Sequence, residues 1–160
     1  MSALAFLSPD AARAGDGFEP RLASPLARAL AEQDAVRDLS GLAKIEVRGE
    51  VPGGVDADVV RLGPHRTLLF CPYERGAELR RSLPGRVFDV TAALAGLELG
   101  GEQAMRRLTD LDLDALPAAG KVADVPAIVL RDGDAFRIFF AQEHGHYVAE
   151  VVLDALAGIA

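Results

Sequence analysis

The sequence predicts an α+β fold in which two similar halves each contribute antiparallel strands and helices. Residues 38–50 resemble residues 89–102 after one insertion, and both stretches open with an aspartate, an aliphatic residue and a hydroxyl residue. Two pairs of short apolar runs follow in the same order, each pair divided by a turn and followed by an amphipathic stretch. Long-period self-similarity indicates architecture before any single residue is interpreted. Because adjacent hairpins with separate helices are typical of α+β folds, we expect an antiparallel sheet and two pseudo-symmetric β(α)ββα halves, residues 38–83 and 89–156.

Composition limits the class of protein. The chain has 160 residues, half of them hydrophobic, which is enough for one domain with a real core. We expect an N-terminal arm, residues 1–23, followed by a single domain, residues 24–160. The net charge of -7 argues against a nucleic-acid-binding protein. The N-terminal residues lack a basic region followed by a long apolar run, and a single cysteine excludes an intrachain disulfide, so we expect a cytoplasmic protein.

The first half begins with a helix signal and continues with strands. Ser24 followed by Pro25 is typical of a helix start, so a short helix is expected over residues 24–33. Residues 44–48 alternate apolar and charged side chains, which predicts a half-buried strand with its charges in solvent. The other expected elements are a hairpin of residues 59–62 and 67–71 and a helix over residues 74–83.

The second half repeats this order with one additional helix. Residues 102–108 predict a helix that has no counterpart in the first half. Asp132-Gly133-Asp134 is a strong turn signal between two apolar runs, and Pro126 indicates an edge strand or a bulge. The other expected elements are strands at residues 87–90, 94–99, 128–131 and 136–141, a loop at residues 110–117 and a closing helix over residues 144–156.

Three histidines are the first candidates for site chemistry. His144 and His146 stand one residue apart before the closing helix, and His65 lies in the hairpin turn of the first half. Two imidazoles could bind a metal, but a tetrahedral site needs four donors, and no carboxylate or thiol has a recognisable ligand spacing. An exposed turn at the helix entry is therefore favoured over a metal site.

The single cysteine, Cys71, follows an apolar run and matches Ala141 of the second half in the alignment of the two stretches. A nucleophile needs a neighbouring base and a lowered pKa, and the local sequence supplies neither. We expect a buried structural thiol, and we assign no catalytic residue.

Three further patterns each have a structural and a functional interpretation. Gly100-Gly101 could present amides to an anion, but a tight turn is favoured, because glycine accepts positive φ without any ligand. Asp110, Asp112 and Asp114 alternate as in calcium loops but lack the hinge glycine and the closing glutamate, so solvated charges are favoured. An arginine cluster could meet an acidic partner or a phosphate, although a solvated helix face paired with nearby glutamates is favoured. The cluster comprises Arg75, Arg80, Arg81 and Arg86, with Glu74 and Glu78 as the expected partners.

A series of structural motifs runs from residue 24 to the C-terminus. It comprises residues 24–26, 42–49, 61–64, 68–70, 88–91, 97–104, 112–114, 126–131 and 136–140. In their order these motifs resemble the gamma subunit of heterotetrameric sarcosine oxidase, a family related to the folate-binding domain of the glycine cleavage T-protein. The chain departs in several respects from the family and its relatives: it is short for the family, and the first half lacks the additional helix of the second. Thr109-Asp110 stands where the family often has Gly-Cys-Pro, and the Lys-Gly-Cys motif of T-protein-like iron–sulfur assembly factors is absent.

This resemblance implies a T-protein-like fold and a non-catalytic subunit that braces a larger enzyme. The parent complex would oxidatively demethylate sarcosine and transfer the one-carbon unit to tetrahydrofolate. Its flavins, NAD and tetrahydrofolate would be held by alpha, beta and delta subunits, and this chain alone would bind no cofactor. The alternative function is a stand-alone binder of a small, folate-like ligand in the groove between the two halves.

The arm supplies the residues to which we assign partner binding. Leu4, Phe6 and Leu7 lie in a segment too short to form its own core. Burial of each such side chain contributes about 1.5–3 kcal/mol. We therefore expect them to dock on this chain's sheet or on a partner subunit, with a frayed terminus as the alternative.

Overall fold

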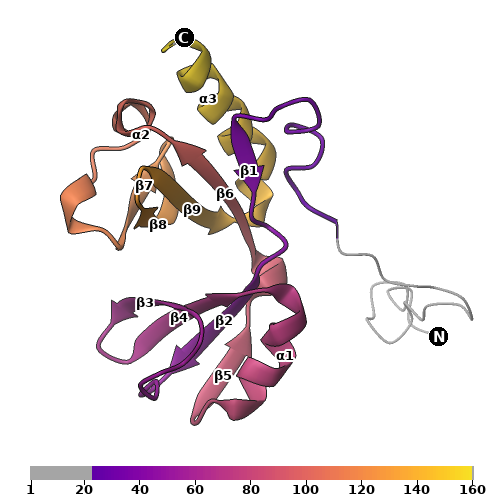
Figure 1. The fold of residues 1–160 in the computed structure, drawn as a ribbon, viewed down its shortest axis with the longest axis vertical. Coiled ribbons are helices and arrows are strands. Elements are labelled where there is room, and N and C mark those ends of the chain that lie inside the picture. Colours follow the sequence, from indigo (N-terminus) through magenta and orange to yellow (C-terminus); the bar gives the residue numbers. More distant parts are fainter. Residues whose placement is uncertain (1–22, 160) are drawn as a thin grey trace, which may run out of the picture.

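In the computed structural model, which describes residues 23–159, the chain forms two antiparallel sheets, one above the other in Figure 1. Three α-helices accompany them, so the predicted mixture of helices and antiparallel strands is confirmed. Leu4, Phe6 and Leu7 lie outside the described residues. Between residues 23 and 159, no helix is both long enough and apolar enough to cross a membrane.

The upper sheet has five strands and the lower sheet has four (Figure 1). In spatial order, the five-stranded sheet comprises β1 (Val36–Asp38), β6 (Leu94–Gly100), β9 (Ala135–Ala141), β8 (Val125–Asp132) and β7 (Ala118–Val122). The four-stranded sheet comprises β3 (Asp58–Gly63), β4 (Arg66–Cys71), β2 (Ala43–Arg48) and β5 (Arg86–Asp89). The helices are α1 (Tyr73–Ser82), α2 (Glu102–Leu108) and α3 (Gly145–Ala157).

One edge strand of each sheet comes, in the sequence, directly before strands of the other sheet. β1 precedes β2 in the sequence but pairs with β6, so that Asp38 lies opposite Leu97. β5 precedes β6 but pairs with β2, so that Asp89 lies opposite Ile45. Figure 1 shows the two connections, β1 to β2 and β5 to β6, passing from one sheet to the other. The two sheets are therefore linked by two crossings of the chain.

The aspartate–hydroxyl motif that the two stretches share makes the same turn at both crossings. The backbone N–H of Ser40 donates to Asp38 Oδ1 at 2.8 Å. The backbone N–H of Thr91 donates to Asp89 Oδ1 at 3.0 Å. Asp side chains commonly stabilise a turn by accepting from the N–H two residues on, which explains why both crossings begin with aspartate.

The hydroxyl groups of these turns tie each half to the other. Ser40 Oγ accepts from the backbone N–H of Gly96 at 3.2 Å, and Thr91 Oγ1 accepts from the backbone N–H of Lys44 at 3.0 Å. All four residues are buried. A hydroxyl acceptor is needed at these positions because a buried N–H without a partner costs free energy.

The helices cover the outer faces of the sheets. Figure 1 shows α2 and α3 beside the five-stranded sheet and α1 beside the four-stranded sheet. α1 approaches closely because Gly76 has no side chain: a Cβ there would lie 2.6 Å from the Cβ of Ala43 on β2. The inner faces of the sheets pack on each other, and an apolar cluster fills the space between them.

The predicted helix over residues 24–33 is wrong. Residues 25–32 form successive turns, with one helix-like hydrogen bond from the N–H of Leu30 to the carbonyl of Leu26 at 3.0 Å. Leu26 is fully buried in the core of the five-stranded sheet. A Cβ on Gly145 of α3 would meet Pro25 at 3.1 Å, so packing against that core determines the path of this segment.

Two strands lacked a signal in the sequence. β1 is only three residues long, and β7 reads Ala-Ala-Gly-Lys-Val, with valine as its single β-branched residue. β8 pairs with β9 along one edge, and the other edge of β8 is free. The segment that precedes β8 in the sequence pairs with this free edge and so becomes β7. Pro126 accordingly lies opposite Lys121 in this outer pair of strands, as expected for proline near a sheet edge.

The turn between β7 and β8 generates a stability prediction. Its two residues, Ala123 and Asp124, have φ angles of 50° and 61°, the region in which a side chain crowds the backbone. Ala123→Gly should raise the free energy of unfolding by about 1 kcal/mol, measured by urea denaturation. The matched control, Ala119→Gly within β7, should lower it, because glycine weakens an extended strand. A destabilised A123G protein would contradict this explanation.

Candidate functional site

The junction between the two sheets brings the most distant parts of the chain together. At its centre the rings of Phe70 on β4 and Phe139 on β9 stack, with centroids 4.0 Å apart and an interplanar angle of 26°. Leu39, Val60 and Leu68 surround this pair and are buried with it. Stacked rings at such distances add to the free energy gained from burial alone, so this contact holds the sheets face to face.

The two rings have different neighbours across their strands. Phe139 lies opposite Gly96 on β6, whereas Phe70 lies opposite Lys44 on β2. A Cβ on Gly96 would be 2.6 Å from ring atoms of Phe139. The absence of a side chain at residue 96 therefore leaves the space that the Phe139 ring occupies.

Lys44 is fully buried at this junction, contrary to the prediction that the charges of this strand face solvent. Its Nζ donates to the carbonyl oxygens of Ser40 at 2.7 Å and Leu42 at 2.9 Å. Burial lowers the pKa of Lys44 to about 8, and the nearby charges of Asp38 and Asp89 oppose this shift. The amine thus holds the turn through which the chain crosses from one sheet to the other.

Glu46 is the second charged residue that the sequence pattern wrongly predicts to face solvent. Its side chain is only 8% exposed and accepts from Arg66 Nη2 at 2.7 Å and Arg48 Nε at 3.0 Å. The hydrogen bond from Arg66, followed by that from Arg48, lowers the pKa of Glu46 although burial opposes it. One signal in the sequence could have predicted the burial of both residues. The neighbouring strand contains Leu68-Leu69-Phe70, which is apolar on both faces. Such a run indicates a sheet that is covered on both faces.

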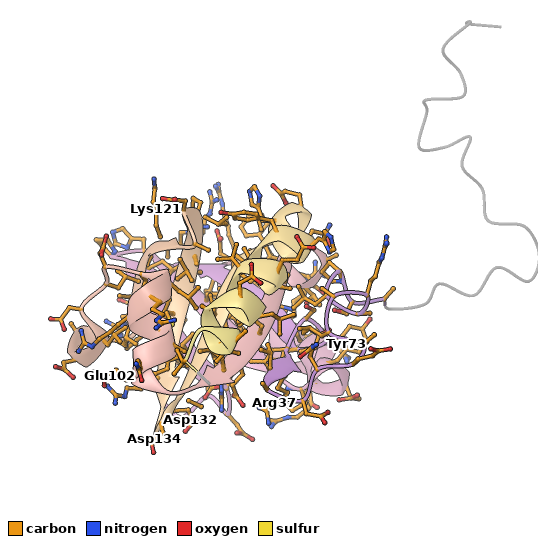
Figure 2. All side chains as sticks on the ribbon, turned by 90° about the horizontal axis from the view of Figure 1, so that it is seen from above. Arg37, Tyr73, Glu102, Lys121, Asp132 and Asp134 are labelled. Carbon is orange, nitrogen blue, oxygen red and sulfur yellow. The ribbon has the colours of Figure 1, made fainter. Side chains whose placement is uncertain are left out.

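Two hollows open from the junction near opposite ends of β4. We call the first the charged hollow; it has a volume of about 410 Å³ and is lined by Arg37, Leu39, Leu42, Val55, Asp56, Ala57, Asp58, Phe70, Cys71, Pro72, Arg75 and Arg137. We call the second the apolar groove; it has a volume of about 570 Å³ and is lined by Leu62, Arg66, Leu94, Ala119, Gly120, Lys121, Pro126, Ala127, Ile128, Phe139, Phe140 and Ala141. Figure 2 places Arg37 of the first and Lys121 of the second on opposite sides of the molecule.

The cations of the charged hollow are paired within the chain. Arg75 contacts Asp56 at 2.7 Å, so its salt-bridge partner is not Glu74 or Glu78 as predicted. Arg137 pairs with Asp58 at 2.6 Å, with Glu98 at 3.1 Å and with Asp132. Because these guanidinium groups already have carboxylate partners, the hollow offers little free positive charge to an anion.

Cys71 lines the charged hollow as a buried thiol. Burial is the main cause of its raised pKa, which favours the unreactive protonated form. The strand pairing places Leu69 opposite Ile45 and Ile138 opposite Leu97. In these registers Cys71 lies opposite Ala43 and Phe140 lies opposite Ala95. The match of Cys71 with Ala141 stays a prediction.

The other candidates from the sequence are dispersed. His65 lies in the β3–β4 turn, His144 precedes α3, and His146 contacts Glu150 at 3.2 Å. Residues 23–159 contain no group of three or more histidine, cysteine or acidic side chains placed to hold a metal ion.

The glycine, aspartate and arginine patterns have local structural roles. Gly101, with φ of 92°, precedes α2, and Asp112 accepts from the backbone N–H of Asp114 at 3.1 Å. The four arginines do not form one cluster. Arg75 is in the first turn of α1, Arg80 and Arg81 are in its last turn, and Arg86 begins β5.

Comparison with solved structures identifies proteins of similar fold. One is a chain of the heterotetrameric sarcosine oxidase from Corynebacterium sp. U-96 in complex with pyrrole 2-carboxylate, with a TM-score of 0.69 and 20% identity over 86% of this chain and 95% of that one. Another is the regulatory subunit of aspartate kinase from Thermus thermophilus in its ligand-free form, with a TM-score of 0.51 and 11% identity over 76% of this chain and 96% of that one. The resemblance to a sarcosine oxidase subunit is thus confirmed at the level of fold. No protein-family model matches the sequence, and no curated protein matches it.

The buried amine predicts how stability depends on pH. The folded-state pKa of Lys44 is about 8 and its ordinary value is 10.5, so between these pH values the unfolded chain binds more protons than the folded one. The free energy of unfolding should therefore rise with pH across this window, by an amount on the order of 3 kcal/mol. Urea denaturation at several pH values should show that Lys44→Met loses this rise, while the matched control, Lys121→Met at an exposed lysine, keeps it. Parallel curves for wild type and K44M would disprove the role of Lys44.

The close approach of Phe139 to Gly96 predicts the effect of one added methyl group. Gly96→Ala should lower the free energy of unfolding by about 1–3 kcal/mol, because the ring must move from its stack with Phe70. Gly100→Ala on the same strand is the matched control, since a Cβ there meets nothing within 4 Å. The double variant G96A/F139L should recover part of the loss in denaturation experiments. Equal stability of G96A and G100A would show that the contact is unimportant.

Proposed function

We propose that this chain is the non-catalytic, gamma-type subunit of a sarcosine-oxidase-like flavoenzyme complex. The observation that carries the proposal is the shared fold, which extends over 95% of the matched chain of heterotetrameric sarcosine oxidase. The family motifs in residues 24–160 support the same assignment.

The chemistry of the junction supports a bracing role. Its charges are satisfied by one another or by backbone carbonyls: Glu46 by Arg66 and Arg48, and Lys44 by Ser40 and Leu42. Groups paired in this way hold the four-stranded sheet and the crossing turn that leads into it, whereas a catalytic acid or base needs a substrate within hydrogen-bond reach.

The proposed complex carries out oxidative demethylation of sarcosine with one-carbon transfer to tetrahydrofolate. Flavins, NAD and tetrahydrofolate are bound by the alpha, beta and delta subunits, and the assembly is a cytoplasmic heterotetramer. Within this chain, we propose one domain over residues 24–160 with a T-protein-like fold. Its halves, residues 38–83 and 89–156, arose by duplication, which the matching turns at Asp38 and Asp89 support.

A second candidate function is a binder of a small, folate-like ligand. It is favoured by the apolar groove, whose volume of about 570 Å³ is in the range of small-molecule sites. The fold shared with a regulatory subunit of aspartate kinase is compatible with this alternative.

The two functions predict different behaviour on purification. Co-expressed with tagged alpha, beta and delta sarcosine oxidase subunits from the same organism, this chain should co-elute with them in stoichiometric amount. Purified alone, it should be colourless and should not oxidise sarcosine. A chain that stays separate from all three subunits but binds tetrahydrofolate in calorimetry would favour the second function. A flavin retained by the isolated chain would contradict the first.

A further inference from the structure

One surface of this acidic chain has a positive charge. The net charge of the chain is -7, yet the residues that line the apolar groove include Arg66 and Lys121 and no carboxylate. The charged hollow differs, because its arginines share their lining with Asp56 and Asp58.

The positive charge continues across the four-stranded sheet. Arg48 lies directly opposite Arg66 on one neighbouring strand and Arg86 on the other, and all three residues are exposed. Like charges opposite each other on paired strands are destabilising. Glu46 offsets two of them, through Arg66 and Arg48. Arg86 has no carboxylate within 4.0 Å among residues 23–159.

Apolar surface accompanies this row of arginines. Phe88 is 43% exposed, and the guanidinium of Arg48 lies over its ring, 5.3 Å from the centroid. At the other end of the row, Arg66 leads into the groove, whose walls include Leu62 and Ile128. We define the basic surface as Arg48, Arg66, Arg86 and Phe88 together with the apolar groove and Lys121.

We propose that the basic surface docks a segment of a partner subunit in which carboxylates flank an apolar side chain. The proposal rests on the subunit function proposed above. The apolar side chain enters the groove, and the carboxylates meet Arg86 and Lys121, the cations that Glu46 does not neutralise. The occupant is a protein segment because the cations extend beyond the groove across three strands, farther than one small anion inside the groove can reach.

Charge reversal tests the electrostatic part of this proposal. Arg86→Glu with Lys121→Glu leaves the Glu46 ion pairs intact, so the fold should survive, which circular dichroism and thermal melting can verify. Retention of this variant by tagged alpha, beta and delta subunits should fall by roughly tenfold or more. The matched control is Arg28→Glu with Arg61→Glu, which changes the net charge equally. Arg28 lies outside the surface, and Arg61 lies opposite Thr67, on the other face of the sheet from Arg66. The control should be retained like wild type.

A photo-crosslinking residue identifies the occupant. Ala119 is exposed and lines the groove, so benzoylphenylalanine at position 119 should crosslink to an acidic peptide of one partner subunit. The same residue at exposed position 77 of α1 should not. Crosslinks to residues 1–22 of this chain or to a second copy would overturn the proposal, as would equal retention of both charge variants. If wild type itself is not retained, the subunit function fails and this inference fails with it; if wild type and both variants are retained equally, only the docking surface is wrong.

Discussion

The exchange of β1 and β5 between the sheets is the constraint on which the other features depend. Because one edge strand of each sheet directly precedes strands of the other sheet in the sequence, the chain must cross the junction twice, once before β2 and once before β6. Each crossing is a turn in which an aspartate accepts from a backbone N–H, and a hydroxyl group then accepts from an N–H of the other half. The sheets are thereby held with their inner faces together, and this positions the Phe70–Phe139 stack and the two hollows beside it.

Burying the inner face of β2 changes the chemistry of its charged residues. In a sheet with one solvated face, Lys44 and Glu46 would be ordinary surface charges. At the junction each of these side chains needs hydrogen-bond partners, and the two side chains have different ones. The amine uses backbone carbonyls of the crossing turn, and its pKa decreases because it loses water. The carboxylate uses arginines that extend into solvent, and its pKa decreases because it gains hydrogen bonds. The first arrangement holds the turn through which the chain crosses between the sheets, and the second ties β2 to β4 within the four-stranded sheet.

The candidate site was only partly accessible from the sequence. Cys71 was correctly placed as a buried residue, and Arg75 and Arg86 were named as charges that could meet an acidic partner. The pairing of Arg75 with Asp56 and the row of Arg86, Arg48 and Arg66 were not foreseen. The first relation joins a helix residue to a loop residue and the second joins three strands, and no spacing along the chain encodes which elements become neighbours. Leu4, Phe6 and Leu7 remain a prediction, since they lie outside the described residues.

The sequence by itself determined the elements whose signals are local. The two hairpins, α2, and the mixture of helices with antiparallel strands follow from apolar periodicity and turn residues, which act over a few positions. Tertiary structure decided the rest. It replaced the expected first helix with turns because Leu26 had to reach the core, and it made β7 a strand because β8 had a free edge. It also turned the charged face of β2 toward the other sheet, because packing between segments far apart in the chain decides what covers each face of a sheet.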